Sequence, residues 1–242
     1  MARALARGWG DPVLCSDTGS GRAQALADEL GGEALQSNAS IADRVDLVIL
    51  CHKPAQLRLV AGELAGRAKA VASILGATSL AALDAAYPGV PVFRLMPNTP
   101  VEVSRGIICY APGPGVGERL ESEVVALFER LGTVLRMAES SIDVATAVMG
   151  VGPAYQALVA EAQVDAAVRY GISAPLAARL VVETMAGTAS LLSSREYDTL
   201  EVRREVTSPG GLTARGLAAL ERSGVRSAFQ DAIDAVVGGR PR

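Results

Sequence analysis

A Ser-Pro-Gly-Gly turn at residues 208–211 is the stretch of the sequence best suited to bind a small anion. Pro209 removes a backbone donor and ends the preceding helical pattern, while Gly210 and Gly211 permit positive φ and leave backbone N–H groups uncovered. These N–H groups open the next helix, where the helix dipole favours an anion. The competing interpretation is an ordinary interhelical turn. The first interpretation predicts a carboxylate site surrounded by the hydroxyls of Thr207, Ser208 and Thr213.

A second set of candidates follows the apolar strands of the amino-terminal half, because doubly wound sheets bind ligands at the carboxyl ends of their strands. These ends are residues 16–17, 51–54, 73–76 and 96–98. Asp17 could hold a ribose hydroxyl, which favours NAD. Alternatively, Ser16, Ser20 and Arg22 could hold a 2′-phosphate, which favours NADP. Asp17 as a cap or turn residue remains a third interpretation.

His52 and Lys53 end one of these strands, and each has two interpretations. His52 is the only histidine of the chain and could be catalytic or a bystander at a strand end. The pair Lys53-Pro54 could contact a cofactor or simply end the strand, because proline lacks the donor that a strand needs.

Alternating strands and helices predict an α/β fold with a doubly wound, mostly parallel sheet over residues 1–140. From Ser141 onward the strand signals stop, and residues 141–242 predict an all-helical domain, whose last helix is expected over Leu212–Val237. The helices are rich in small residues and offer wide apolar faces, which a second copy of the chain could cover. The 242 residues, 50% of them hydrophobic, suffice for two such domains.

Composition argues against several other functions. The formal net charge of −3 disfavours a nucleic-acid-binding surface. Cys15, Cys51 and Cys109 are far apart in a chain with a single histidine, so a metal site is not expected and the pattern fits a reducing cytoplasm. No apolar run appears long enough to span a bilayer, and the amino terminus lacks the apolar core of a signal peptide.

The phosphate-binding loop of a dinucleotide fold is missing from this sequence. Such a fold begins with a strand and a Gly-x-Gly-x-x-Gly loop whose amides face the pyrophosphate. The Gly-Ser-Gly run at residues 19–21 follows what would be the second strand, so it does not fill that role. Without a central first strand, the neighbouring strands are expected either to close up or to leave unpaired edges.

Three motifs together resemble the pyrroline-5-carboxylate reductase family over essentially the whole chain. They are Met96-Pro97-Asn98-Thr99-Pro100, Gly152-Pro153-Ala154-Tyr155 and Val206-Thr207-Ser208-Pro209-Gly210-Gly211-Leu212-Thr213. The resemblance implies reduction of 1-pyrroline-5-carboxylate to proline with NADPH or NADH. It also implies a Rossmann-like domain, followed by a helical domain through which the chain is expected to form a homodimer that could assemble into a higher oligomer of dimers.

The resemblance also assigns residues to roles. By this resemblance, the backbone of Ser208, Gly210 and Gly211 binds the substrate carboxylate, and Val206 and Thr207 line the same pocket. Thr213 would touch the ring nitrogen and orient the imine. The residues that would bind the dinucleotide are Asn38, Lys53, Pro54, Gly76 and Asn98.

Two departures from the family pattern limit this assignment. Met149 and Val151 stand where the family has serines, which removes hydroxyls from that helix start. Met1 resembles the methionine that closes the family's glycine loop, so the loop and the first strand would lie upstream. A non-catalytic, dimerising or ligand-binding relative is therefore the alternative function, and weak NADPH binding is expected of residues 1–242.

A related reductase for another cyclic imine or for a hydroxy acid is a third possibility. Dehydrogenases of hydroxy acids with this architecture use a lysine deep in the helical domain. Residues 141–242 contain no lysine, which argues against the hydroxy acid.

Overall fold

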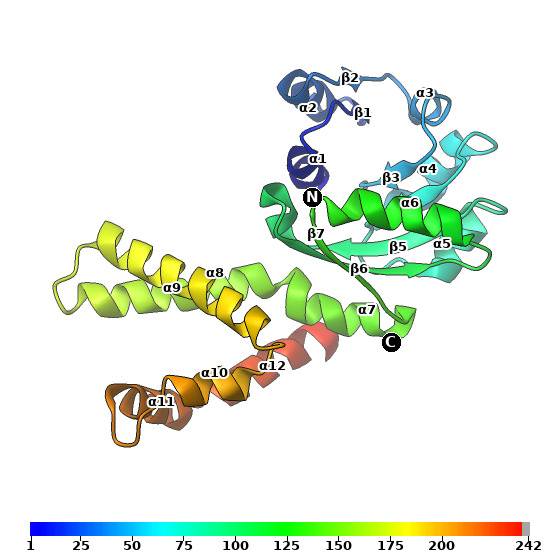
Figure 1. Ribbon diagram of the computed structural model, residues 1–242. Coiled ribbons are helices and arrows are strands. Elements are labelled where there is room, and N and C mark those ends of the chain that lie inside the picture. Colours follow the sequence, from blue (N-terminus) through cyan, green and yellow to red (C-terminus); the bar gives the residue numbers. More distant parts are fainter. Residues whose placement is uncertain (239–242) are drawn as a thin grey trace. The chain divides into compact units, whose positions relative to one another are not determined.

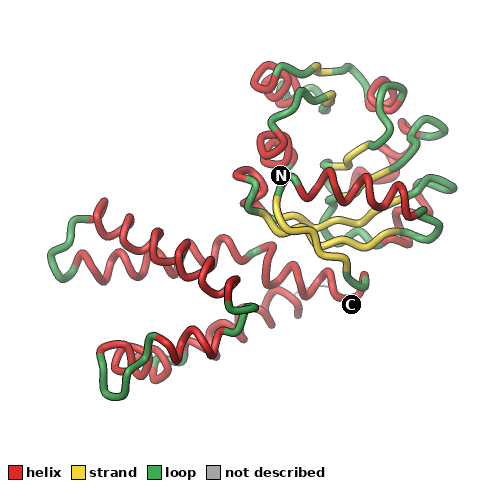
Figure 2. The backbone as a smooth tube through the Cα atoms, viewed as in Figure 1, coloured by secondary structure: helices red, strands yellow, loops and turns green. Residues whose placement is uncertain are grey.

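The structure is a computed structural model of the chain that describes residues 1–238 (Figures 1 and 2). It divides into two compact units, Met1–Pro153 and Ala154–Arg242. Strands occur only in the first of these within the described residues, and the second is helical, as the sequence predicts.

The strands of the N-terminal unit form two separate sheets. The strands are β1 (Leu14–Cys15), β2 (Glu33–Ala34), β3 (Val48–Leu50), β4 (Val71–Ser73), β5 (Val92–Pro97), β6 (Gly106–Pro112) and β7 (Gly132–Arg136). One sheet is β1-β2 and the other has the order β3-β4-β5-β6-β7. Every pair is parallel except β5 with β6, which confirms the mostly parallel sheet.

Helices fill the connections between these strands. They are α1 (Ala2–Trp9), α2 (Arg22–Leu30), α3 (Asn38–Ala42), η1 (Pro54–Gln56), α4 (Leu57–Leu64), α5 (Leu80–Ala86), η2 (Thr99–Val103), α6 (Glu118–Glu129), α7 (Glu139–Ala145) and η3 (Thr146–Gly150). The short β2 and α3 have no counterpart among the elements expected from the sequence, because neither carries an apolar run.

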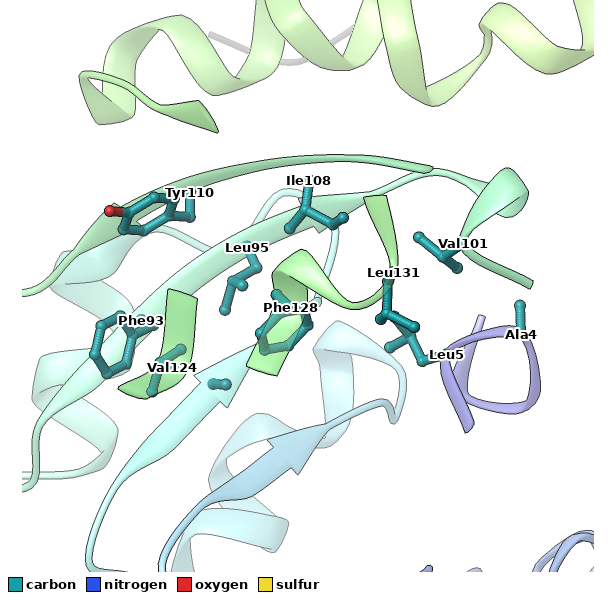
Figure 3. Close-up of a cluster of buried hydrophobic side chains, with 11 residues drawn as sticks. Ala4, Leu5, Phe93, Leu95, Val101, Ile108, Tyr110, Val124, Phe128 and Leu131 are labelled. Carbon is teal, nitrogen blue, oxygen red and sulfur yellow. The ribbon is translucent and has the colours of Figure 1, made fainter. Parts of the chain in front are cut away.

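Two hydrophobic clusters hold the five-stranded sheet between its helices. In one, Phe93 and Leu95 of β5 meet Phe128 of α6 and Leu5 of α1, each no more than 1% exposed (Figure 3). In the other, α4 and α5 pack residues such as Leu83 against β3 and β4. Fully burying a large apolar side chain contributes about 1.5–3 kcal/mol, so these clusters dominate the stability of the unit.

The two sheets share no strand. Among residues 1–238, β1 and β3 therefore each have one edge that is not hydrogen-bonded to another strand. β1 bonds only to β2, where Val13 and Cys15 accept the N–H groups of Glu33 and Leu35. Of the two outcomes expected without a central first strand, the structure shows the unpaired edges. Free edges leave the hydrogen-bonding capacity of the strands unused.

The predicted domain boundary at Ser140 lies earlier than the division of the structure after Pro153. The side chains of Arg94 in β5 and of Asn98 just after it explain the difference. Arg94 pairs with Glu139 and Asp143 of α7, and the amide of Asn98 donates to the carbonyl of Met149 in η3. These contacts attach α7 and η3 to the sheet, although both are helical.

The C-terminal unit has helices with little buried surface of their own. After α8 (Gly152–Val168) come α9 (Ala174–Ser194), α10 (Thr199–Glu205), α11 (Leu212–Arg222) and α12 (Val225–Gly238). The single helix expected over Leu212–Val237 is wrong, because Gly224 adopts the left-handed region with φ 74° and separates α11 from α12. Within the described part of this unit, the buried hydrophobic residues are Ala177 and Val202.

One helical stretch bears on the expectation that no segment spans a membrane. Residues Glu139–Val168 are long and apolar enough to cross a bilayer by length and composition, with a mean hydropathy of 1.3. Its hydropathy comes mainly from valines and alanines that are interspersed with polar residues and glycines, so the sequence shows no unbroken apolar run here. Only 11% of the apolar window is buried within the described structure, so most of this stretch is exposed in a single chain.

Candidate functional site

The Ser-Pro-Gly-Gly segment forms a tight turn in the structure. The carbonyl of Ser208 accepts the N–H of Gly211 at 3.1 Å, and Gly210 has φ 70°. Proline at the second position and a positive-φ glycine at the third define a type II turn. Gly211 then serves as the N-cap of α11 without any side-chain hydrogen bond to the helix start. The first amides of α11 are therefore left for another acceptor.

The side chains around this turn differ in whether they are free to contact a ligand. The hydroxyl of Thr207 donates to the carbonyl of Arg203 at 2.5 Å, so it is engaged within α10. The hydroxyl of Thr213 makes no hydrogen bond within the described chain, and its side chain is exposed. Val206 and Leu212 are 55% and 80% exposed, which is unusual for apolar residues beside a turn. The N–H of Gly211 closes the turn, so what remains for a ligand is the first amides of α11 and, within the described residues, the unbonded hydroxyls of Ser208 and Thr213 beside apolar side chains.

In the N-terminal unit, the loop after β1 is organised by Asp17. Its carboxylate accepts the N–H groups of Gly19, Ser20 and Ala23 and the hydroxyl of Ser20. The N–H of Ala23, followed by the Ser20 hydroxyl, lowers the pKa of Asp17 to about 2. Of the three interpretations of Asp17, the structure supports the cap or turn residue, because its carboxylate bonds to the loop and to the N–H of Ala23 in the first turn of α2, whose N-cap is Gly21.

Asn38 joins three elements through its side chain. Its amide oxygen accepts the hydroxyl of Ser16 at 2.6 Å, and its amide nitrogen donates to Glu63 of α4. Asn38 therefore holds the end of β1 close to α3 and α4. Its position at the carboxyl ends of the strands agrees with the place expected for a cofactor residue, and its amide is already hydrogen-bonded.

The end of β3 carries His52 and Lys53. Nδ1 of His52 donates to the carbonyl of Lys53 at 2.9 Å, while its Nε2 is buried and has no hydrogen-bond partner in the described structure. The N–H of Lys53 donates to the side chain of Gln56, and Pro54 begins η1. The ammonium of Lys53 forms no ion pair with any described residue, so it is available to an anion.

Gly76 and Asn98 differ strongly in exposure. No atom lies within 4 Å of a Cβ built on Gly76, so the backbone after β4 is open to a ligand. Asn98 is 7% exposed, accepts the N–H of Ile107 at 2.9 Å and donates to Met149 at 3.1 Å. The side chain of Asn98 thus fixes η3 against β6, which the motif alone did not reveal.

The residues predicted for the site therefore fall into two groups, one in each unit. The residues of the turn lie together at the start of α11, and those assigned to the dinucleotide lie at the ends of β3, β4 and β5 and at the start of α3. The cations of Arg22, at the start of α2, and Lys53, after β3, lack partners within the described part of the chain, and Nε2 of His52 lacks a hydrogen-bond partner. Unpaired cations and open backbone fit an anionic dinucleotide.

A cavity of about 600 Å³ lies elsewhere in the N-terminal unit and includes none of the predicted site residues. It lies between α5 and the turn after β6 and is lined by Leu80, Ala81, Asp84, Pro112, Gly113, Pro114, Val116, Glu121, Arg136 and Glu139. Glu139 is paired with Arg94, and Glu121 is paired with Arg136. We do not assign a ligand to this cavity.

Comparison with known proteins gives consistent matches over most of the chain. Residues 139–239 match the family described as pyrroline-5-carboxylate reductase dimerisation. The pyrroline-5-carboxylate reductase of Corynebacterium melassecola is 36% identical over 221 residues, covering 88% of this chain and 82% of the relative. The enzyme of the same name from Synechocystis is also 36% identical, covering 82% of this chain and 75% of the relative.

Solved structures agree with these relatives. The 1-pyrroline-5-carboxylate reductase of Streptococcus pyogenes has a TM-score of 0.90 at 28% identity, covering 99% of this chain and 93% of that chain. The pyrroline carboxylate reductase of Plasmodium falciparum, solved with NADP bound, has a TM-score of 0.85 at 25% identity, covering 98% and 91%.

Proposed function

The chain belongs to the pyrroline-5-carboxylate reductase family, and from that premise we propose how its residues serve the reduction of 1-pyrroline-5-carboxylate to proline. The enzyme is an oxidoreductase that acts on the C=N bond of a cyclic imine. The main support for the assignment of the substrate site is the start of α11 after the Ser208–Gly211 turn, which has no side-chain cap. The backbone amides of this turn and helix start hold the substrate carboxylate, because a helix N-terminus favours an anion.

The comparisons do not favour a non-catalytic relative of the family. Relatives named as reductases match this chain over both the sheet and the helical region. The hydroxy-acid alternative lacks the lysine that it requires in residues 141–242. We also propose a cytoplasmic location, because the three cysteines are free in the structure.

A reduced nicotinamide cofactor, NADPH or NADH, supplies the hydride when it is bound. We assign its binding to the strand ends of the N-terminal unit. Lys53 offers an unpaired cation, Pro54 shapes the loop after β3, and the backbone at Gly76 is open. Asn38 and Asn98 act mainly through the loops that their amides hold in place.

Thr213 is the residue that we assign to the imine nitrogen. Its hydroxyl has no hydrogen-bond partner in the described chain and lies on the first turn of α11, next to the amides assigned to the carboxylate. A threonine hydroxyl is a poor acid near neutral pH, so Thr213 orients the ring and water supplies the proton. Holding the ring in one orientation is itself a large contribution to rate.

Thr213→Ala is expected to lower kcat/KM for pyrroline-5-carboxylate by about 10-fold to 100-fold, because a hydrogen bond to a charged group is worth about 1.5–3 kcal/mol. Thr213→Ser keeps the hydroxyl and should retain most of the activity. Thr133→Ala removes an exposed hydroxyl from β7 and serves as the control. Steady-state kinetics of the four proteins decide the matter, and unchanged kinetics in Thr213→Ala would remove Thr213 from the mechanism.

We propose that the C-terminal helices form a homodimer, and that dimers can assemble further. The family match over residues 139–239 concerns dimerisation, and large apolar side chains are exposed on the helices of this unit. They include Leu158, Leu176, Leu180, Val182 and Leu220. A partner chain covers such surfaces, and the apolar stretch Glu139–Val168 then needs no membrane.

Leu180→Glu is expected to convert the dimer to a monomer, because it places a charge on an apolar helix face that is 51% exposed in one chain. Leu59→Glu, at a 62% exposed position of α4, is the matched control and should remain a dimer. Sedimentation velocity measures both masses. A Leu180→Glu protein that stays dimeric would move the interface away from this face of α9.

A further inference from the structure

The helix α9 carries only two charged side chains along its 21 residues, Arg179 and Glu183. They lie one helical turn apart, and both are exposed. Leu176 and Leu180 lie beside them, each more than half exposed, and these four residues together with Thr184 line a hollow of about 420 Å³ on the surface of the helix. We call these five residues the α9 patch. It combines two opposite charges with an apolar surface.

Neither charge of the α9 patch has a partner within one chain. Among residues 1–238, no carboxylate lies within 4.0 Å of the guanidinium of Arg179, and no cation lies within that distance of the carboxylate of Glu183. Their order along the helix is also the weaker one for a pair in the same chain, because an acid placed four positions before a base is the better arrangement. An isolated charge is costly to cover with apolar surface. A partner that covers this patch must therefore supply an acid for Arg179 and a base for Glu183.

A second copy of the chain supplies both groups in the required arrangement. In a two-fold symmetric dimer, if residue i of one chain contacts residue j of the other, residue j also contacts residue i. A two-fold axis at the level of Val181, midway between the charges, sets Arg179 opposite Glu183 of the partner subunit and Glu183 opposite Arg179 of the partner subunit. A single antiparallel crossing of two α9 helices then pairs both charges. The match of residues 139–239 to a dimerisation family agrees with this choice of partner.

The spacing of the charges also bears on how the two helices align. If one α9 slides along the other by one turn, about four residues, then like charges meet. Either Glu183 comes to lie opposite Glu183 of the partner subunit, or Arg179 comes to lie opposite Arg179 of the partner subunit. Like charges placed together disfavour a wrong partner or a wrong alignment. The two charges therefore favour one alignment over those one turn away.

We infer that Arg179 and Glu183 form two reciprocal ion pairs across the homodimer, and that these pairs select a second copy of this chain as the partner and set the register of the paired α9 helices. The inference rests on the proposed homodimer and names the side chains that align it. Leu176 and Leu180 supply apolar area around the pairs. Charge pairs that such neighbours shield from water interact more strongly than exposed pairs.

Charge reversal tests the inference, with sedimentation velocity for the dissociation constants and native mass spectrometry for the composition of the dimers. Arg179→Glu and Glu183→Arg should each weaken the homodimer about 100-fold, because two ion pairs become like-charge contacts at roughly tenfold each. An equimolar mixture of these two variants should form mainly the heterodimer, in which every contact again joins opposite charges.

The double variant Arg179→Glu/Glu183→Arg keeps the net charge of the original chain and should form a homodimer of the same stability. Its dimer would show that both substitutions are compatible with the fold, so that weak association of the single variants is not caused by misfolding. Arg58→Glu reverses an exposed arginine of α4 and controls for net charge, and it should leave the dissociation constant unchanged.

Unchanged dissociation constants in both single variants would overturn the inference, as would a mixture that contains homodimers and heterodimers in statistical proportion. A double variant that is folded by circular dichroism but monomeric would also overturn it. These results leave the proposed homodimer standing as long as the original chain is dimeric. A monomeric original chain would contradict the homodimer itself and leave the α9 patch to another partner.

Discussion

Gly211→Ala is expected to lower kcat/KM for pyrroline-5-carboxylate about 100-fold, mainly through a higher KM. A Cβ on Gly211 would lie 2.3 Å from Oγ of Ser208 and 3.2 Å from its carbonyl oxygen. The side chain of Ser208 must then rotate, and its carbonyl must shift by a few tenths of an ångström, which changes the geometry of the turn. The displaced amides no longer converge on the carboxylate, and loss of two hydrogen bonds to a charged group, at about 1.5 kcal/mol each, weakens substrate binding roughly 100-fold.

Gly216→Ala is the matched control for this glycine. Gly216 also lies in α11, and no atom lies within 4 Å of a Cβ built on it. Alanine favours a helix by about 1 kcal/mol over glycine, so this variant should be as stable as the original or slightly more stable. Steady-state kinetics with thermal melts of both variants separate loss of binding from loss of fold. An unchanged KM in Gly211→Ala would refute the assignment of the carboxylate to this turn.

Arg94→Met is expected to lower the free energy of unfolding of the N-terminal unit by about 3 kcal/mol, since removing one partner from a buried ion pair costs about 3–5 kcal/mol. The side chain of Arg94 is only 5% exposed and bonds to Glu139 at 3.0 Å and to Asp143 at 2.8 Å. Both carboxylates are partly exposed, at 33% and 44%, so water relieves some of the penalty and the lower end of that range applies.

Arg67→Met provides the comparison at the surface. Arg67 pairs with Asp43 at 2.7 Å, but both side chains are about half exposed, at 49% and 51%. Exposed pairs contribute about 0–1 kcal/mol. Urea unfolding can be followed by the fluorescence of Trp9, the single tryptophan, which packs edge-on against Phe128. An equal decrease in the free energy of unfolding in the two variants would show that the buried pairs of Arg94 contribute no more to stability than an exposed pair.

The sequence predicted most elements that depend on local patterns. Apolar runs located the strands of the main sheet, and the Pro-Gly-Gly sequence located the turn before α11. The short β2 and α3 were missed because their residues are ordered by neighbours, as when Asn38 bonds to Glu63, 25 positions away. The break before α12 was missed because Ser223 and Gly224 can also lie within a helix.

The candidate site was predictable in position but less so in detail. Hydrogen bonds inside the protein occupy Asp17, Thr207 and Asn98, and each of these bonds depends on a backbone geometry that composition does not show. Sequence could name a polar residue at a strand end. Whether its acceptors were free depended on loop conformation, as the left-handed glycines after Asp17 illustrate.

The attachment of α7 to β5 constrains how this protein can exchange parts with its relatives. A crossover that replaced the chain from residue 139 onward, where the dimerisation family begins, would bring in a foreign partner for Arg94. A crossover after Pro153 would keep Arg94, Glu139 and Asp143 together. Chimeras joined at the later position should therefore be the soluble ones, because the unit that must be exchanged whole is the sheet together with the two helical segments that follow β7, α7 and η3.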